Sequence, residues 1–192
     1  VLDATTLYAS SYKKQTVAID APSGRPLWSH DAGGPGRVGV SSDRVVVSGP
    51  TGTVWGLDKA GGSGLWQQDV LTRRNLTGVA IQGDYAVVGD YDGYLHWLKL
   101  ADGALAARTR VGKNSLRSTP TVSEGILVAQ DTGGRLSAYR LGQYRQAWRP
   151  GNKEAGSRHS LVVTVLLFRR RQALDPSLPG SVHPAHRPLG RP

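Results

Sequence analysis

The chain contains no cysteine among its 192 residues. This absence excludes disulfide bonds, thiolate metal sites and a cysteine nucleophile. It leaves the compartment open, because a protein without thiols suits oxidising and reducing surroundings alike. The G-x-S-x-G elbow that presents a catalytic serine is absent as well. These absences predict a protein that is not an enzyme.

Long hydrophobic segments are also missing. The longest apolar run, residues 161–168, is much shorter than the ~20 residues that a helix needs to cross a bilayer. Residues 1–4 have neither the basic nor the apolar region of a signal peptide, and the first residue is not Met. We therefore expect no membrane-spanning helix, and we expect the chain to begin inside a longer protein.

Charge and proline divide the sequence into two parts. Residues 1–141 contain 15 Lys and Arg and 12 Asp and Glu, whereas residues 142–192 contain nine and two. The second part also holds six of the eleven prolines and shows no repeat. We predict a folded domain over residues 1–141, followed over residues 142–192 by a basic, Pro- and Arg-rich tail that is disordered or non-native sequence. On this hypothesis the tail has no function.

Four segments of the first part resemble one another. They begin at Leu7, Val45, Tyr85 and Ile126 and read LYASSYKKQTVAIDAPSGRPLW, VVVSGPTGTVWGLDKAGGSGLW, YAVVGDYDGYLHWLKLADGALAA and ILVAQDTGGRLSAYRLGQYRQAW. Their second strands align at Val17, Val54, Leu95 and Leu136, so the successive offsets are 37, 41 and 41 residues. This period is typical of four-stranded β-propeller blades and too long for a leucine-rich or hexapeptide solenoid.

Each unit contains an apolar strand, a tight turn, an alternating strand and, after a second turn, a third strand. The tight turns contain Gly52, Gly93 and Gly134, which suit the positive φ of short hairpins. No segment shows a sustained helical period. The sequence therefore predicts an all-β protein, a partial β-propeller of about four blades, each a four-stranded antiparallel meander.

Tryptophan recurs at one position of the repeat. Trp28 and Trp66 occupy it in the first two units and Trp148 in the fourth, while the third unit has Ala107 there. A meander must bury two faces against its neighbours, so a residue repeated once per blade indicates packing between blades. We therefore assign Trp28 and Trp66 to structural docking rather than to stacking on a cofactor.

Two motifs resemble those of a known superfamily. The strings VAIDAPSGRPLW and GLDKAGGSGLW are similar to the tryptophan-docking repeat of pyrroloquinoline-quinone-type (PQQ) propellers, A-x-D-x-x-[ST]-G-x-x-x-W. The segment VVGDYDGYLHW, residues 87–97, resembles one branch of that superfamily, the outer-membrane protein assembly factors BamB. The resemblance covers residues 1–141 and not the tail.

This resemblance implies an eight-bladed parent, held by an N-terminal lipid anchor at the periplasmic face of the outer membrane of a Gram-negative bacterium. It implies a non-catalytic scaffold subunit of the β-barrel assembly (BAM) complex that binds the periplasmic POTRA domains of BamA and unfolded outer-membrane proteins. No cofactor and no nucleic acid are expected. The chain departs from the family in having about half of the blades and no lipobox cysteine. The family's acidic BamA-binding loop would precede Val1, so no contact residue is carried over.

Two other functions remain open on the sequence. A fragment of a quinone (PQQ)-dependent dehydrogenase is the first alternative, although such an enzyme needs a complete ring and a calcium site. An intracellular repeat adaptor is the second. The sequence upstream of the chain would separate these hypotheses.

Candidate metal ligands are sparse. Asp90 and Asp92 resemble the start of a calcium loop, but the other oxygen ligands of an EF-hand are absent, and we interpret the pair as part of a hairpin turn. His96 has no second His, Cys or carboxylate at ligand spacing. His183 and His186 have metal-like spacing without a third ligand. We therefore predict no metal site.

Two connections between units are candidate partner-binding surfaces, because propeller loops are exposed and rigidly held. Residues 71–76 combine Arg73, Arg74 and Leu76, a mixture suited to a protein partner. Residues 108–117 carry four cations, Arg108, Arg110, Lys113 and Arg117. Charged loops are common on any surface, so a merely solvated loop is the alternative in both cases.

Overall fold

The computed structural model describes residues 1–143 and 161–166, which form sixteen strands. Blade 1 contains β1 (Leu2–Asp3), β2 (Thr6–Ser10), β3 (Thr16–Asp20) and β4 (Pro26–His30), and blade 2 contains β5 (Gly39–Val40), β6 (Arg44–Ser48), β7 (Val54–Asp58) and β8 (Gly64–Gln68). Blade 3 contains β9 (Ala80–Gln82), β10 (Tyr85–Gly89), β11 (Tyr94–Lys99) and β12 (Leu105–Arg110), and blade 4 contains β13 (Thr121–Ser123), β14 (Ile126–Gln130), β15 (Leu136–Gln143) and β16 (Leu161–Leu166). The part of the chain described here has no helix able to cross a membrane.

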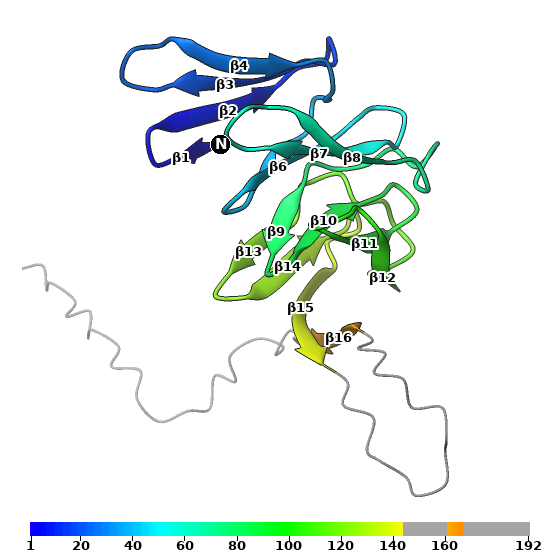
Figure 1. The fold of residues 1–192 in the computed structure, drawn as a ribbon. Helices are drawn as coiled ribbons and strands as arrows, with labels where there is room; N and C mark the ends of the chain where they lie inside the picture. The colour runs from blue at the N-terminus through cyan, green and yellow to red at the C-terminus, as the bar shows by residue number, and fades with distance from the viewer. Residues whose placement is uncertain (144–160, 167–192) are drawn as a thin grey trace, which may run out of the picture.

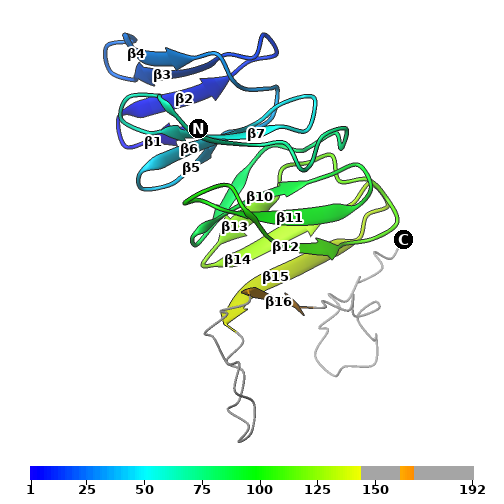
Figure 2. The same ribbon diagram turned by 45° about the vertical axis from the view of Figure 1, so that its right-hand side comes forward.

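Each blade is an antiparallel meander whose strands are hydrogen-bonded in chain order. The blades stack side by side, with β9 of blade 3 next to both β5 and β13 (Figures 1 and 2). The last strands, β4, β8 and β12, lie at the opposite edge of their sheets. This arrangement confirms the prediction of an all-β partial propeller with four blades.

One rim of the stack concentrates the loops that join one blade to the next. This connection rim lies on the right-hand side of Figure 1. It comprises the turns between the second and third strands of each blade, residues 11–15, 49–53, 90–93 and 131–135. It also comprises the connections between blades, residues 31–38, 69–79 and 111–120. The remaining turns, which join first to second and third to fourth strands, form the opposite rim.

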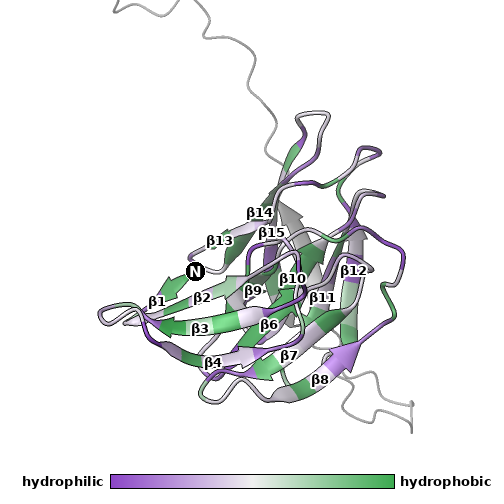
Figure 3. Cartoon of the chain, turned by 90° about the horizontal axis from the view of Figure 1, so that it is seen from above, coloured by the Kyte–Doolittle hydropathy of each residue, from purple (hydrophilic) through white to green (hydrophobic). Residues whose placement is uncertain are grey.

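The core lies in the middle strands of the blades. Three consecutive residues of β6 are buried, as are three of β10: Val45, Val46, Val47, Ala86, Val87 and Val88. Neighbouring blades cover both faces of these sheets, so the strands carry continuous apolar runs rather than an alternation. Seen from above in Figure 3, hydrophobic residues colour much of β10 and β11, whereas the end of β8 is hydrophilic.

The turns between second and third strands take the conformation that the sequence predicts. Gly52, Gly93 and Gly134 have φ values of 93°, 84° and 82°, and in blade 1 Lys14 occupies the same position with φ 59°. Glycine adopts this left-handed region without the steric cost that a Cβ imposes. The repeat therefore fixes the hairpin conformation in three of the four blades by residue type.

Blade 4 is completed by a segment far along the chain. We expected its last strand around Trp148, which lies outside the described residues. The structure places β16 in that role, with Leu161 opposite Gln143 and Leu166 opposite Ala138. Strand β15 itself extends two residues past Leu141. The division into a domain over 1–141 and a tail over 142–192 stays a prediction.

Trp28 and Trp66 bridge neighbouring blades. The indole Nε1 of Trp28 donates a hydrogen bond to the carbonyl of Lys59 at 3.0 Å, and that of Trp66 donates to the carbonyl of Leu100 at 2.8 Å. Both carbonyls belong to the turn between the third and fourth strands of the next blade. Each tryptophan thus fixes its own outer strand to the blade that follows.

A glycine in the same turn lets each tryptophan ring approach. A Cβ at Gly103 would lie 2.5 Å from the ring of Trp66, whereas the equivalent Gly24 of blade 1 has nothing within 4 Å. Both glycines have positive φ, 74° and 69°. We expect Gly103→Ala to lower the free energy of unfolding by about 2 kcal/mol, from backbone strain plus overpacking, and Gly24→Ala by about 1 kcal/mol, from strain alone. Urea denaturation of both variants measures the difference, and equal losses would show that the ring contact carries no energy.

The seam between blades 3 and 4 uses a different device, because Ala107 stands where the docking tryptophan would be. Trp97 of β11 is fully buried, and its Nε1 donates to Oε1 of Gln82 at 2.8 Å. The Gln82 amide in turn donates to the carbonyls of Gly125 at 2.8 Å and Tyr139 at 3.0 Å, both in blade 4. The Trp97 and Tyr139 rings meet edge to face with centroids 5.8 Å apart. Here a core tryptophan joins the blades.

Candidate functional site

The two connections singled out from the sequence meet at the hairpin of β10 and β11, whose turn, residues 90–93, lies on the connection rim. Leu76, in the connection before blade 3, forms an isolated antiparallel bridge with Asp90. From the connection after blade 3, the amide of Leu116 donates to the Asp90 carbonyl at 3.0 Å. The hairpin is therefore held from both sides, and segments about forty residues apart share one surface.

Asp90 organises this hairpin through both carboxylate oxygens. Its Oδ2 accepts a hydrogen bond from Arg74 at 2.7 Å and lies 2.8 Å from Nε2 of His96. Its Oδ1 accepts the backbone amides of Asp92 at 3.0 Å and Tyr94 at 2.9 Å. A carboxylate with this many donors fixes the turn, the strand and the incoming loop together.

The protonation of Asp90 follows from these contacts. Burial by itself would raise the pKa of the carboxyl, but the hydrogen bonds from His96, the Tyr94 amide and Arg74 outweigh it and lower the pKa from 3.8 to about 2. The side chains of Asp90 and His96 are both fully buried. A substrate has no access to this pair, so its chemistry is that of a structural anchor.

Arginine side chains gather over the tyrosines of the same hairpin. The guanidinium carbons of Arg74, Arg108 and Arg110 lie 5.8, 5.0 and 5.3 Å from the ring centroid of Tyr94, and that of Arg117 lies 5.4 Å from the ring of Tyr91. These distances are within the range of cation–π attraction. The aromatic faces thus hold several like charges close together on one surface.

A polar groove of about 530 Å³ continues this surface between blades 3 and 4. Its lining includes the cations Arg110, Lys113 and Arg135. Asp131, which also lines it, is buried and accepts the amides of Gly133 and Arg135, each at 2.9 Å. Its Oδ1 is occupied by its own turn and its Oδ2 lies 3.5 Å from the Asn114 amide, so three cations and one carboxylate line the groove.

The predicted loop residues differ in availability. Arg73 is exposed, with φ 69°, and its amide donates to the Thr51 carbonyl at 2.9 Å. Arg74 is half-buried and ion-paired with Asp90. Leu76 is half-buried against a core cluster of blades 2 and 3. Of these three predicted residues Arg73 alone is exposed, and Arg74 and Leu76 hold the loop in place.

Other residues of the surface were not predicted as site residues. Tyr91, Tyr94 and Arg135 carried no predicted role. We interpreted His96 as a strand residue without a carboxylate at useful spacing, yet its ring bonds Asp90. The hairpin register could have predicted this contact. Val88 pairs with His96, and Asp90, two residues after Val88, therefore lies on the same face and diagonally across from His96.

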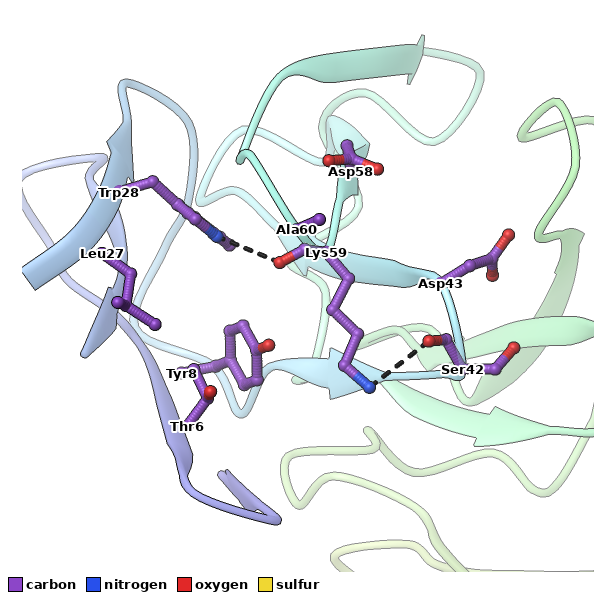
Figure 4. Close-up of a pocket in the computed structure, with 9 residues that line it drawn as sticks. All are labelled: Thr6, Tyr8, Leu27, Trp28, Ser42, Asp43, Asp58, Lys59 and Ala60. Carbon is purple, nitrogen blue, oxygen red and sulfur yellow. Dashed lines mark hydrogen bonds between the residues drawn. The ribbon is translucent and has the colours of Figure 1, made fainter. Parts of the chain in front are cut away.

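A second hollow, of about 520 Å³, lies between blades 1 and 2 on the opposite rim (Figure 4). Tyr8, Leu27 and Trp28 form one wall, and Lys59 stands on the other. The Lys59 ammonium donates to the carbonyl of Ser41 at 3.0 Å and pairs with a blade 1 carboxylate. Its charge is therefore used in joining the blades, and the hollow is part of the docking seam.

Metal-binding groups are scattered in the described residues. Within residues 1–143 and 161–166, no three His, Cys, Asp or Glu side chains come together in a way that could hold an ion. Asp90 is saturated by protein donors, and Asp92 is exposed beside it. His183 and His186 lie outside the described residues. The site is therefore a surface of charged and aromatic side chains.

Comparison with known proteins agrees with this architecture. The sequence profile of the family described as "Outer membrane protein assembly factor BamB" matches residues 1–68 and 50–177. The chain belongs to this family. The outer membrane protein assembly factor BamB of Xanthomonas campestris pv. campestris is 62% identical over 143 residues, and that of Pseudomonas aeruginosa is 38% identical over 141. These alignments cover 74% and 73% of the chain.

The chain is shorter than these relatives. It spans about a third of their length, 35% of the Xanthomonas protein and 37% of the Pseudomonas protein. The crystal structure of BamB from Moraxella catarrhalis superimposes with a TM-score of 0.65 at 28% identity, covering 73% of the chain and 41% of that protein. A computationally designed protein, Ika4, superimposes with a TM-score of 0.64 at 17% identity, which shows a shared fold only.

Proposed function

We propose that this chain is part of a longer, non-catalytic scaffold subunit of the outer-membrane β-barrel assembly machinery. In this proposal the parent protein is an eight-bladed propeller at the periplasmic face of the outer membrane, and it assists insertion of β-barrel proteins by binding the POTRA domains of BamA. The observation that carries the proposal is the identity of 62% to a protein named as an outer membrane assembly factor. A quinone-dependent dehydrogenase is not favoured.

The geometry supports a scaffold in two ways. The blades are joined by the half-buried Trp28 and Trp66 and by the buried Trp97–Gln82 pair, so they present their loops on a rigid frame. The acidic centre of the connection rim, Asp90, is buried with His96 and is inaccessible to a substrate. Rigid loops and an inaccessible titratable pair suit partner binding rather than turnover.

Capture of BamA tests this function. The full-length parent, immobilised, should retain the purified periplasmic domains of BamA at concentrations on the order of micromolar, as expected for a stable subunit interface. A periplasmic protein of similar size and charge from outside the assembly machinery is the matched control and should flow through. Failure to retain the BamA domains, or equal retention of the control, would count against the proposal.

A further inference from the structure

Eight side chains form a basic and aromatic surface on blades 3 and 4, in loops of the connection rim and on the adjoining ends of β11 and β12. We call it the arginine surface; it comprises Arg74, Tyr91, Tyr94, Arg108, Arg110, Lys113, Arg117 and Arg135. Arg110 belongs both to the cluster over Tyr94 and to the groove beside Asp131, and so joins the two halves. Both candidate loops of the sequence therefore contribute to one surface.

The six cations of this surface outnumber the three carboxylates beside them, Asp90, Asp92 and Asp131, so the surface carries an excess of positive charge. Asp90 and Asp131 are buried and bonded to backbone amides of their own turns, and only Asp92 of the two turns is exposed. Among the residues that the structure describes, Arg74 alone of the six cations makes a salt bridge. Like charges held this close raise the local positive potential and favour an anionic partner.

Arg74 anchors the connection before blade 3 on Asp90, but the other five cations of the surface make no salt bridge among the described residues. Stacking on Tyr94 and Tyr91 orients Arg108, Arg110 and Arg117, but these arginines are exposed and do not join one blade to another by ion pairs in the described part of the chain. Oriented guanidinium groups are pre-organised for bidentate bonds to carboxylates, with less entropy lost on binding.

We propose that the arginine surface binds an acidic peptide segment of a protein partner, with carboxylates on the arginines and a side chain against Tyr91. The inference rests on the proposed function in that it takes the partner to be a protein of the assembly machinery. The groove favours an extended peptide over a bilayer, because its cations line a concave space of about 530 Å³ rather than a flat plane. Carboxylates of an extended chain reach into such a groove from alternate positions.

Binding of a defined acidic probe tests the surface directly. The probe is a fluorescein-labelled peptide of alternating Glu and Ser, and its control has Gln in place of Glu; anisotropy is measured with the purified chain. Arg108→Gln/Arg110→Gln should weaken binding of the Glu peptide about fivefold, and added salt should weaken it further. The charge-matched control, Arg25→Gln/Lys99→Gln on the opposite rim, should change it less than about twofold. Circular dichroism confirms that each variant is folded.

Three outcomes would overturn this inference. Equal weakening by the two double variants would show a general charge effect, and equal binding of the Gln peptide would show that carboxylates are not recognised. The surface would be assigned to a lipid if phosphatidylglycerol vesicles retained the wild-type chain but not Arg108→Gln/Arg110→Gln, and if the Glu peptide did not compete for this binding. If the full-length parent and its double variant capture the BamA domains equally well, the proposed function stands and the arginine surface is not its interface.

Discussion

We expect Trp97→Ala to lower the free energy of unfolding by about 3–5 kcal/mol, the range for removal of a buried aromatic side chain. Trp97 is fully buried and packs edge to face on Tyr139 of the next blade. The substitution leaves a cavity and also leaves Oε1 of the buried Gln82 without its donor. Because Gln82 bonds two carbonyls of blade 4, the loss extends across the seam. Urea denaturation followed by far-UV circular dichroism measures it.

Trp55→Ala is the matched control for this variant. Trp55 is half-buried, and its Nε1 donates at 3.2 Å to the exposed side chain of Gln67. Less apolar area is lost there, and the freed groups reach water, so we expect a loss of about 1–2 kcal/mol. Trp97→Phe should fall between the two, since it keeps ring packing and removes the hydrogen bond. Equal losses for Trp97→Ala and Trp55→Ala would contradict the assignment of Trp97 to the blade seam.

The repeat carried enough local information to predict most of each blade. Strands β7 and β11 contain Val54 and Leu95, at which we aligned the units, and the turn glycines have the positive φ that their type suggests. These features depend on residues within a few positions of one another. The sequence predicted four strands per blade but did not locate the first ones, because β5, for example, spans only Gly39–Val40 and is too short to show a period.

The two loops of the candidate site were predicted separately, because the contact between them depends on the tertiary structure. Composition marked Arg74 and Arg110 as members of two separate loops. That both stack on Tyr94 follows from the way the chain enters and leaves blade 3, which no local pattern encodes. The tryptophan of blade 3 was likewise missed, since Ala107 holds the repeat position and Trp97 acts from the neighbouring strand. A search for repeats does not detect that a tryptophan on a neighbouring strand has replaced the docking tryptophan.

Asp90→Asn is expected to lower the free energy of unfolding by about 3 kcal/mol at neutral pH, because it breaks a buried ion pair from one side. Arg74 loses its 2.7 Å partner, and the buried ring of His96 loses the carboxylate that it bonds. Asp92→Asn is the control: that carboxylate is exposed and lies 3.5 Å from Arg74, so its loss should cost less than about 0.5 kcal/mol. Urea denaturation of both variants at neutral pH gives the comparison.

The pH dependence separates the charge of Asp90 from its packing. Its folded pKa, about 2, lies below the ordinary value of 3.8, so the stabilisation is complete above pH 3.8 and is lost as the pH falls through about 2. A shift of this size corresponds to roughly 2 kcal/mol. The difference in the free energy of unfolding between the wild-type chain and Asp90→Asn should therefore narrow by most of that amount between pH 4 and pH 2. If the difference in the free energy of unfolding between the wild-type chain and Asp90→Asn were the same at every pH, shape rather than charge would hold the Arg74 connection on the hairpin.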